Sequence, residues 1–233
     1  HLEVIFDPYS AGAQQHGAYV TAMYPVPPQE SPPMPPHSAF EPGDDVMNLV
    51  ARLEAPSSGP IPTLVSDLAS SLLTDASDER ATPGNTFNNT NIHGPVQCAE
   101  LGVSLAQAPA AVRAILEEAV RHQFPGLVAV RFVRSSLATL AFTKFEPTTC
   151  TIALPGAAGQ ATLDFYAAVR ERLDREDIAF TQHWGQRGEF SRERVRRMYG
   201  SALDVWVEQR RRFLSPAGRR LFSNALLERC GLA

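Results

Sequence analysis

The chain has 233 residues, of which 44% are hydrophobic and 20% are charged, and its formal net charge is −4. This is the composition of a globular protein with a buried core, and it excludes a disordered or fibrous chain. The negative charge argues against a nucleic-acid-binding surface, and no apolar run approaches the roughly 20 residues that a membrane-spanning helix needs.

Two strands are expected at the start of the chain. The apolar residues Leu2, Val4 and Phe6 recur at every second position, which is the strand pattern. A turn-forming stretch follows, and a second strand is expected over residues 18–24. The chain opens on His1, without a methionine and as if a strand were already in progress. We therefore expect a further part of the protein to precede it.

A proline-rich segment comes next. Residues 25–36 contain seven prolines, which fix φ and remove amide donors, so this segment is expected to be extended. We interpret it as a semi-rigid surface loop, with a partner-binding peptide as the alternative. Short helices are predicted over residues 44–53 and 61–73, and a long turn-forming loop over 82–91.

The rest of the chain is expected to be α+β, with a mostly antiparallel sheet, helices on one face and a helical C-terminal tail. The expected strands are 96–105, 127–133, 137–145, 150–154 and 178–180, and the expected helices are 109–121, 163–173, 191–213 and 225–229. The arginines of the 191–213 helix are interpreted as a solvated face or one that pairs with an acidic domain, with an anionic docking patch as the alternative. Cys98, Cys150 and Cys230 lack the spacing of metal ligands, so no metal site is expected.

A dense polar cluster follows the last expected strand. Phe180-Thr181-Gln182-His183-Trp184-Gly185-Gln186 sets an imidazole, an indole and two amides beside a glycine. By composition alone it is a turn around a half-buried tryptophan.

The cluster resembles the His-Trp-Gly segment of flavin-linked oxidases of the vanillyl-alcohol oxidase type, which include covalent-flavin cholesterol oxidases, sugar-lactone oxidases and alditol oxidases. Two other segments fall in the family's order. Residues 128–133 resemble its Glu-x-Arg cavity strand, and residues 214–224 resemble its closing Asp-Pro…Phe-Ser-Asn. The three segments span only the last hundred or so residues.

The resemblance implies FAD as the cofactor and a division of labour along the chain. Residues 1–186 would form a substrate-binding, or cap, domain, with the loop 82–91 bordering the cavity entrance. Residues 187–233 would form a helical tail that returns toward an FAD-binding domain outside this chain. The scattered glycines of the chain do not form a phosphate-binding loop, which agrees with that division.

The resemblance also implies the site residues. His183 would hydrogen-bond the substrate hydroxyl and act as a base, since imidazole titrates near neutral pH. In the competing interpretation its ring N–H only pins the loop. Arg131 would hold the substrate or the flavin, or pair with a carboxylate such as Glu100 or Glu146. Asn224 would reach the flavin or substrate oxygen, or else only cap a helix. The residues expected to shape the cavity are Trp184, Gln186, Tyr24 and Phe40.

Two departures from the family bear on the substrate. Ala129 stands where the family often has the glutamate of Glu-x-Arg, and Gln186 where several sugar oxidases have lysine. A bulky secondary alcohol such as a sterol is therefore favoured over a sugar lactone or an alditol, which stays an alternative. By resemblance, the electrons would pass to oxygen and give hydrogen peroxide. The hypothesis from another class is a non-catalytic α+β binding or regulatory domain whose proline-rich loop binds a partner.

Overall fold

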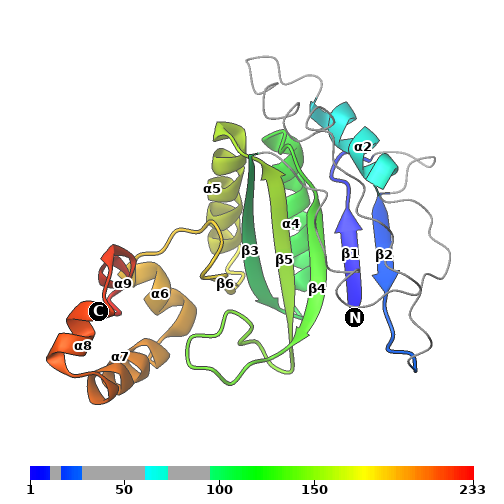
Figure 1. The fold of residues 1–233 in the computed structure, drawn as a ribbon. Helices are drawn as coiled ribbons and strands as arrows, with labels where there is room; N and C mark the ends of the chain where they lie inside the picture. The colour runs from blue at the N-terminus through cyan, green and yellow to red at the C-terminus, as the bar shows by residue number, and fades with distance from the viewer. Residues whose placement is uncertain (11–16, 28–60, 73–94) are drawn as a thin grey trace, which may run out of the picture. The chain divides into compact units, whose positions relative to one another are not determined.

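The computed structural model describes residues 1–10, 17–27, 61–72 and 95–233 (Figure 1). The strands are β1 (Leu2–Phe6), β2 (Ala18–Ala22), β3 (Val96–Ser104), β4 (Val128–Arg134), β5 (Thr148–Ala157) and β6 (Phe180–Gln182). The helices are α2 (Ile61–Leu72), α4 (Ala108–Arg121), α5 (Gln160–Arg175), α6 (Arg192–Tyr199), α7 (Ala202–Phe213), α8 (Pro216–Leu221) and α9 (Ala225–Cys230). The expected helix at 44–53, the segment 28–36, the loop 82–91 and Phe40 lie outside the described residues.

The strands form one antiparallel sheet in the order β2-β1-β4-β5-β3-β6. From β3 to β6 the chain runs β-α-β-β-α-β, and these four strands lie in the order β6-β3-β5-β4. That is the split β-α-β, or ferredoxin-like, arrangement. The β1–β2 hairpin extends it at the β4 edge, with Val4 opposite Val130. Helices α4 and α5 lie on the same face of the sheet (Figure 1), which confirms the predicted α+β fold.

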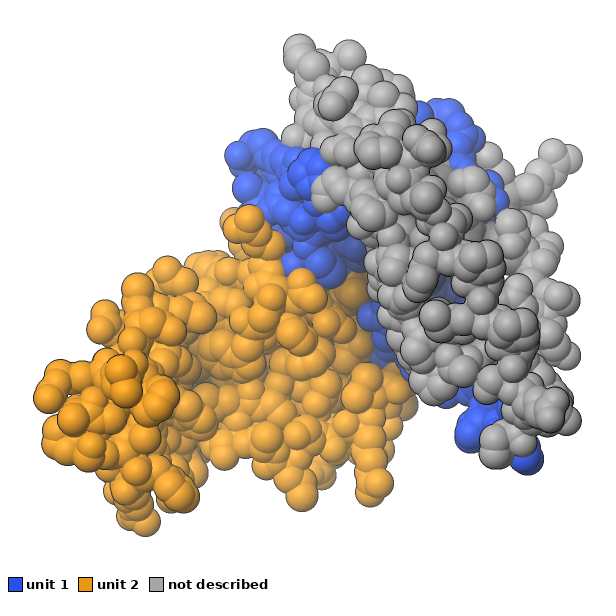
Figure 2. Space-filling model, viewed as in Figure 1, with its two compact units in different colours: residues 1–98, 115–131, 154–169 blue, residues 99–114, 132–153, 170–233 orange. Residues whose placement is uncertain are grey.

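Two compact units divide the chain (Figure 2). Unit 1 comprises residues 1–98, 115–131 and 154–169. Its core stacks the ring of Phe124 on that of Phe165, with centroids 4.1 Å apart. The Tyr166 hydroxyl donates to the carbonyls of Gln97 and Leu154, at 3.1 and 2.7 Å. These hydrogen bonds tie α5 to the two neighbouring strands β3 and β5.

Unit 2 comprises residues 99–114, 132–153 and 170–233. It contains β6 and the helices α6 to α9, which build a core of their own. The buried members of that core are Phe190, Val195, Met198, Tyr199, Leu203, Cys230 and Leu232. The predicted boundary at Gln186, between a cap domain and a tail, stays a prediction.

Two secondary-structure predictions were wrong, and one helix was not predicted. The single helix expected at 191–213 is two helices, because Gly200 ends α6 with φ of +56°. The strand expected at 137–145 is a loop, and we call residues 135–147 the β4–β5 loop. Helix α8 was not predicted, although Ser215 followed by Pro216 is a common helix start.

Three ion pairs of the described residues join the tail to α5: Arg194–Asp174, Arg197–Asp174 and Arg170–Glu189. The pair of Arg194 with Asp174 gives a first testable prediction. Arg194 binds Asp174 through two hydrogen bonds of 3.0 and 2.6 Å, and the side chains are only 13% and 21% exposed. We expect Asp174→Asn to lower the free energy of unfolding by about 1–2 kcal/mol, because a bidentate, charge-assisted pair is lost from a poorly hydrated position. Urea unfolding measures this. Asp204→Asn, which breaks the solvent-exposed pair of Asp204 with Arg196, serves as the control and should leave the midpoint unchanged.

Candidate functional site around His183

The His183 turn begins where β6 ends. The His183 amide donates to the Glu100 carbonyl at 2.9 Å, so the pairing of β6 with β3 continues one residue beyond the strand. The Gln186 amide then donates to the His183 carbonyl at 3.1 Å and closes a turn over residues 183–186. The polar cluster that the sequence singled out is therefore a tight turn at the end of an edge strand.

The His183 ring is held by two neighbours. The Gly185 amide donates to Nδ1 at 3.1 Å, and the ring meets that of Phe142 edge-on, with centroids 4.8 Å apart. Since Nδ1 accepts this hydrogen bond, the neutral ring carries its proton on Nε2. In the competing interpretation, the ring N–H of His183 pins the loop. The ring does bind the loop, but its Nδ1 accepts the hydrogen bond instead of donating one. Nε2–H is left as a hydrogen-bond donor.

The β4–β5 loop brings Phe142 to this place. Its carbonyl accepts a hydrogen bond of 2.5 Å from the Thr181 hydroxyl on β6. The loop can come this close to the sheet because β3 has a glycine there: a Cβ on Gly102 would lie 2.5 Å from the Phe142 oxygen. A glycine in the middle of a strand often marks such a close backbone approach.

Trp184 belongs to the core of the tail. Its indole stacks on Phe190 and on Tyr199, with centroids 4.9 and 5.9 Å away, and its Nε1–H donates to the Leu140 carbonyl at 2.9 Å. The packing interpretation of this residue is therefore confirmed. Its predicted contribution to a cavity wall stays a prediction.

The sequence singled out Gln182 as a member of the polar cluster but did not show its role. The buried Gln182 amide both accepts from the Glu189 N–H and donates to the Glu189 carbonyl, each at 3.0 Å, which closes the segment after the turn. Sequence reasoning missed Lys144, which donates to the Met198 carbonyl at the end of α6 and lies 5.5 Å from the centroid of the Tyr199 ring. Burial lowers the pKa of Lys144, although much of this residue is exposed. No local pattern points to Lys144, since its partners are distant in sequence.

The Tyr199 hydroxyl is buried and has no hydrogen-bond partner among the described residues. The indole N–H of Trp184 is close enough to lower the pKa of this hydroxyl slightly, but its hydrogen bond goes to Leu140. Burial is the larger effect and raises the pKa of Tyr199 to about 12 from its usual 10.0.

This hydroxyl gives a second prediction. The unfolded chain releases the tyrosine proton near pH 10 and the folded chain only near 12, so the contribution of Tyr199 is complete below pH 10 and is lost as pH rises to about 12. We expect Tyr199→Phe to be as stable as the parent at neutral pH, because no hydrogen bond is lost. As pH rises from 10 to about 12, the free energy of unfolding of Tyr199→Phe should fall by about 1–2 kcal/mol less than that of the parent. Chemical denaturation at several pH values measures both, and an identical pH dependence in the two proteins would contradict it.

The other predicted site residues have different partners. Arg131 forms an ion pair of 2.7 Å with Glu3, its neighbour across the β1–β4 register. The Asn224 side chain accepts from the Leu227 amide at 3.0 Å and caps α9, which confirms the helix-cap interpretation. Tyr24 is 80% exposed. The structure thus gathers His183, Trp184 and Gln186 in one turn, and the convergence of Arg131 and Asn224 on them stays a prediction.

The described residues were also compared with what a metal site, a membrane-spanning helix or a ligand-sized hollow requires. In the described part of the chain, no group of three or more histidine, cysteine or acidic residues could hold a metal ion. No helix of the described residues is long and apolar enough to cross a membrane. Two hollows, of about 670 and 550 Å³, lie among the C-terminal helices, and His183 lines neither of them.

The chain folds as an α+β protein. The turn after its edge strand β6 fixes the imidazole of His183 through the hydrogen bond from the Gly185 amide. No protein-family model matches the chain, and no curated protein sequence matches it significantly.

Proposed function

We propose that the chain is the substrate-binding part of an FAD-dependent alcohol oxidase that acts on a bulky secondary alcohol such as a sterol. The observation that carries the proposal is the His183 ring, whose Nδ1 is occupied by the Gly185 amide at 3.1 Å. An imidazole held in one tautomer can offer Nε2–H to a substrate oxygen in a fixed direction. The resemblance of three segments to the vanillyl-alcohol oxidase type supplies the cofactor and the reaction.

In this proposal His183 orients the alcohol. Its Nε2–H donates to the substrate oxygen, which places the carbinol carbon for transfer of its hydride. FAD, when bound, would supply the hydride acceptor, and oxygen would reoxidise it to give hydrogen peroxide. The hydroxyl proton of the alcohol would leave to water or to a base of the FAD-binding domain, because His183, as a donor, does not accept it. For His183 to act as the base, Nε2 would have to lose its proton, and the Gly185 amide opposes the tautomer that this requires. We therefore assign His183 as a donor, in place of the base that the sequence suggested.

We assign this chain to the substrate side of the flavin. Gly102 would offer a close approach to the sheet, but the Phe142 carbonyl already fills the space that a Cβ would take there. No glycine-rich loop that could cradle a diphosphate is found in the described part of the chain. The FAD-binding domain that the resemblance implies would therefore hold the cofactor, and this chain would contribute His183 and the β4–β5 loop.

An apolar substrate is supported by the surroundings of His183. The centroid of the Phe142 ring lies 4.8 Å from that of the imidazole, and the two rings meet edge-on. An aromatic neighbour favours a hydrophobic alcohol over a polyol, which needs many hydrogen-bond partners. Sugar lactones and alditols remain the alternative substrates.

A docking surface for the FAD-binding domain is supported by exposed apolar residues at the C-terminal ends of α7 and α8. Phe213 of α7 is 84% exposed, and Leu221 and Phe222 at the end of α8 are 77% and 62% exposed. Large exposed apolar surfaces commonly mark an interface. Several arginines of α7 and α8 flank them, which fits a partner with acidic groups.

The test is the visible absorbance of the protein expressed from its complete gene. The proposal predicts a flavin spectrum and about one flavin per chain after extraction. A colourless protein that also takes up no FAD when supplied with it would reject the oxidase and leave the non-catalytic binding domain as the better account.

A further inference from the structure

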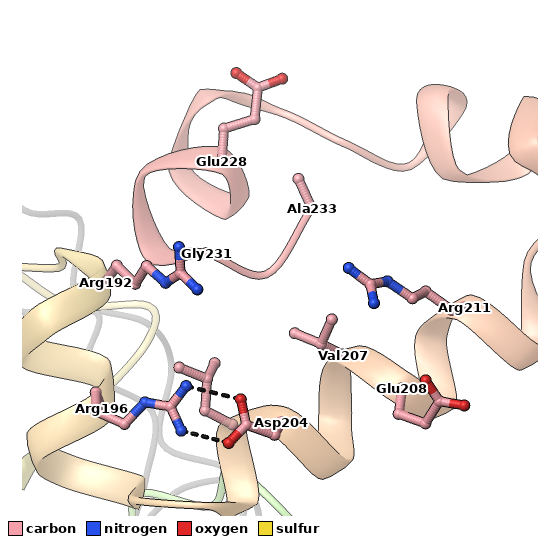
Figure 3. Close-up of a pocket in the computed structure, with 10 residues that line it drawn as sticks. Arg192, Arg196, Asp204, Val207, Glu208, Arg211, Glu228, Gly231 and Ala233 are labelled. Carbon is pink, nitrogen blue, oxygen red and sulfur yellow. Dashed lines mark hydrogen bonds and ion pairs between the residues drawn. The ribbon is translucent and has the colours of Figure 1, made fainter.

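A hollow of about 670 Å³ lies between α6, α7 and the turn that follows α9 (Figure 3). Leu203 and Val207 of α7 form its apolar part. Arg192 of α6 and Arg211 of α7 extend their guanidinium groups into it from two sides (Figure 3). We propose that this hollow binds a small oxyanion that carries two negative charges, a phosphate or a dicarboxylate. The inference does not depend on the proposed oxidase function.

Arg192 and Arg211 face the hollow without an ion pair of their own among the described residues. The acidic residues of α7 at the hollow each have another arginine as partner: Asp204 pairs with Arg196, and Glu208 pairs with Arg212 at 2.9 Å. Arg196, and to a smaller extent Arg192, lower the pKa of the Asp204 carboxyl. The positive charges of Arg192 and Arg211 repel each other across the hollow, and an oxyanion between them would reduce that repulsion.

The side-chain stem of Arg192 lies against the backbone at Gly231. Gly231 ends α9 in the left-handed region, at φ of +71°, and a Cβ on it would lie 2.9 Å from both Cγ and Cδ of Arg192. The absence of a side chain at Gly231 therefore lets the arginine stem lie against the backbone. A stem that is already packed loses less conformational freedom when its guanidinium binds a ligand.

The ligand class follows from the geometry of the donors. Planar guanidinium groups match carboxylate and phosphate oxygens in pairs, and a ligand with two anionic ends or faces can engage both arginines. Glu228 is the acidic residue at the hollow that has no ion pair among the described residues, and its carboxylate points away from Arg192 and Arg211 in Figure 3. The adjoining hollow of about 550 Å³ shares Arg211 and adds Arg219 and Arg220, so the positive potential continues on that side.

Isothermal titration calorimetry of the full chain at low ionic strength, with inorganic phosphate and with succinate, tests the proposal. We expect saturable binding of one anion per chain for at least one probe, and the tighter probe identifies the ligand chemistry. Arg192→Gln and Arg211→Gln should each weaken it about tenfold or more, since each removes a charged hydrogen-bonding partner.

Arg197→Gln is the matched control. Arg197 lies on α6, as Arg192 does, and carries the same charge, but it pairs with Asp174 and lines neither hollow. A specific site predicts nearly unchanged affinity in this variant. Equal weakening by Arg192→Gln and Arg197→Gln would show a general effect of net charge and overturn the proposal, as would the absence of saturable binding for both probes. Thermal melts of the variants check that each one is folded.

Discussion

His183→Ala is expected to slow reduction of the bound flavin by a secondary alcohol about a hundredfold. The variant loses the only imidazole of the turn, whose Nε2–H we assign to the substrate oxygen. Removal of one preorganised hydrogen-bond donor at a reacting oxygen typically costs about 10²–10³-fold in rate. Rapid mixing without oxygen measures the reduction step directly. The flavin content should stay as in the parent protein, because we assign binding of the FAD diphosphate to the FAD-binding domain and not to His183.

His183→Gln separates the donor role from that of a base. A glutamine amide can donate a hydrogen bond but cannot accept a proton near neutral pH. The donor role predicts that His183→Gln recovers part of the rate lost in His183→Ala, whereas the base role predicts equal losses. His122→Gln, which alters a histidine paired with Glu118 at the end of α4, serves as the control and should leave the rate unchanged. Full activity in His183→Ala would remove His183 from the mechanism.

Gly102→Ala is expected to lower the free energy of unfolding by about 2–3 kcal/mol. The new Cβ would lie 2.5 Å from the Phe142 oxygen and 2.7 Å from the Thr181 hydroxyl oxygen, so the β4–β5 loop has to move. Overpacking at a tight backbone approach costs about 1–3 kcal/mol, and the hydrogen bond between Thr181 and Phe142 is strained as well. The displacement also draws the Phe142 ring away from His183, so slower turnover should accompany the loss of stability.

The control for this variant is Gly218→Ala in α8. The nearest atom to a Cβ there is the Ser215 hydroxyl oxygen at 3.4 Å, and alanine is a better helix former than glycine. Gly218→Ala should therefore match or slightly exceed the parent in stability. A midpoint of urea unfolding that is unchanged in Gly102→Ala would contradict the close approach of the loop to the sheet.

The elements with strong local patterns could be predicted from the sequence. The apolar stripe of residues 109–121 gave α4, and the β-branched runs gave β4 and β5 to within a few residues. The strand predicted over residues 137–145 does not form, because these residues make other contacts. The Leu140 carbonyl accepts from the indole of Trp184, and the Phe142 ring meets His183. A turn over residues 138–141 and a hydrogen bond from the Ser136 amide to the Thr143 carbonyl replace the strand pairing. Periodicity shows that a residue is apolar, but not which surface it covers.

The candidate site was predictable only in its local part. The sequence pointed to residues 180–186, and these do form a turn after β6. It could not point to Phe142, which reaches the site through a loop that the sequence predicted as a strand. It also could not assign Glu3 to Arg131, because that pairing depends on the register of β1 against β4, a contact between residues far apart in the chain.

Anaerobic addition of a sterol to the protein expressed from its complete gene and loaded with FAD decides whether this chain serves an alcohol oxidase. Our account predicts that the visible flavin band bleaches, that His183→Ala bleaches about a hundredfold more slowly, and that admitted oxygen restores the band with release of hydrogen peroxide. A flavin band that stays unchanged with sterols, other secondary alcohols, sugar lactones and alditols would contradict the account.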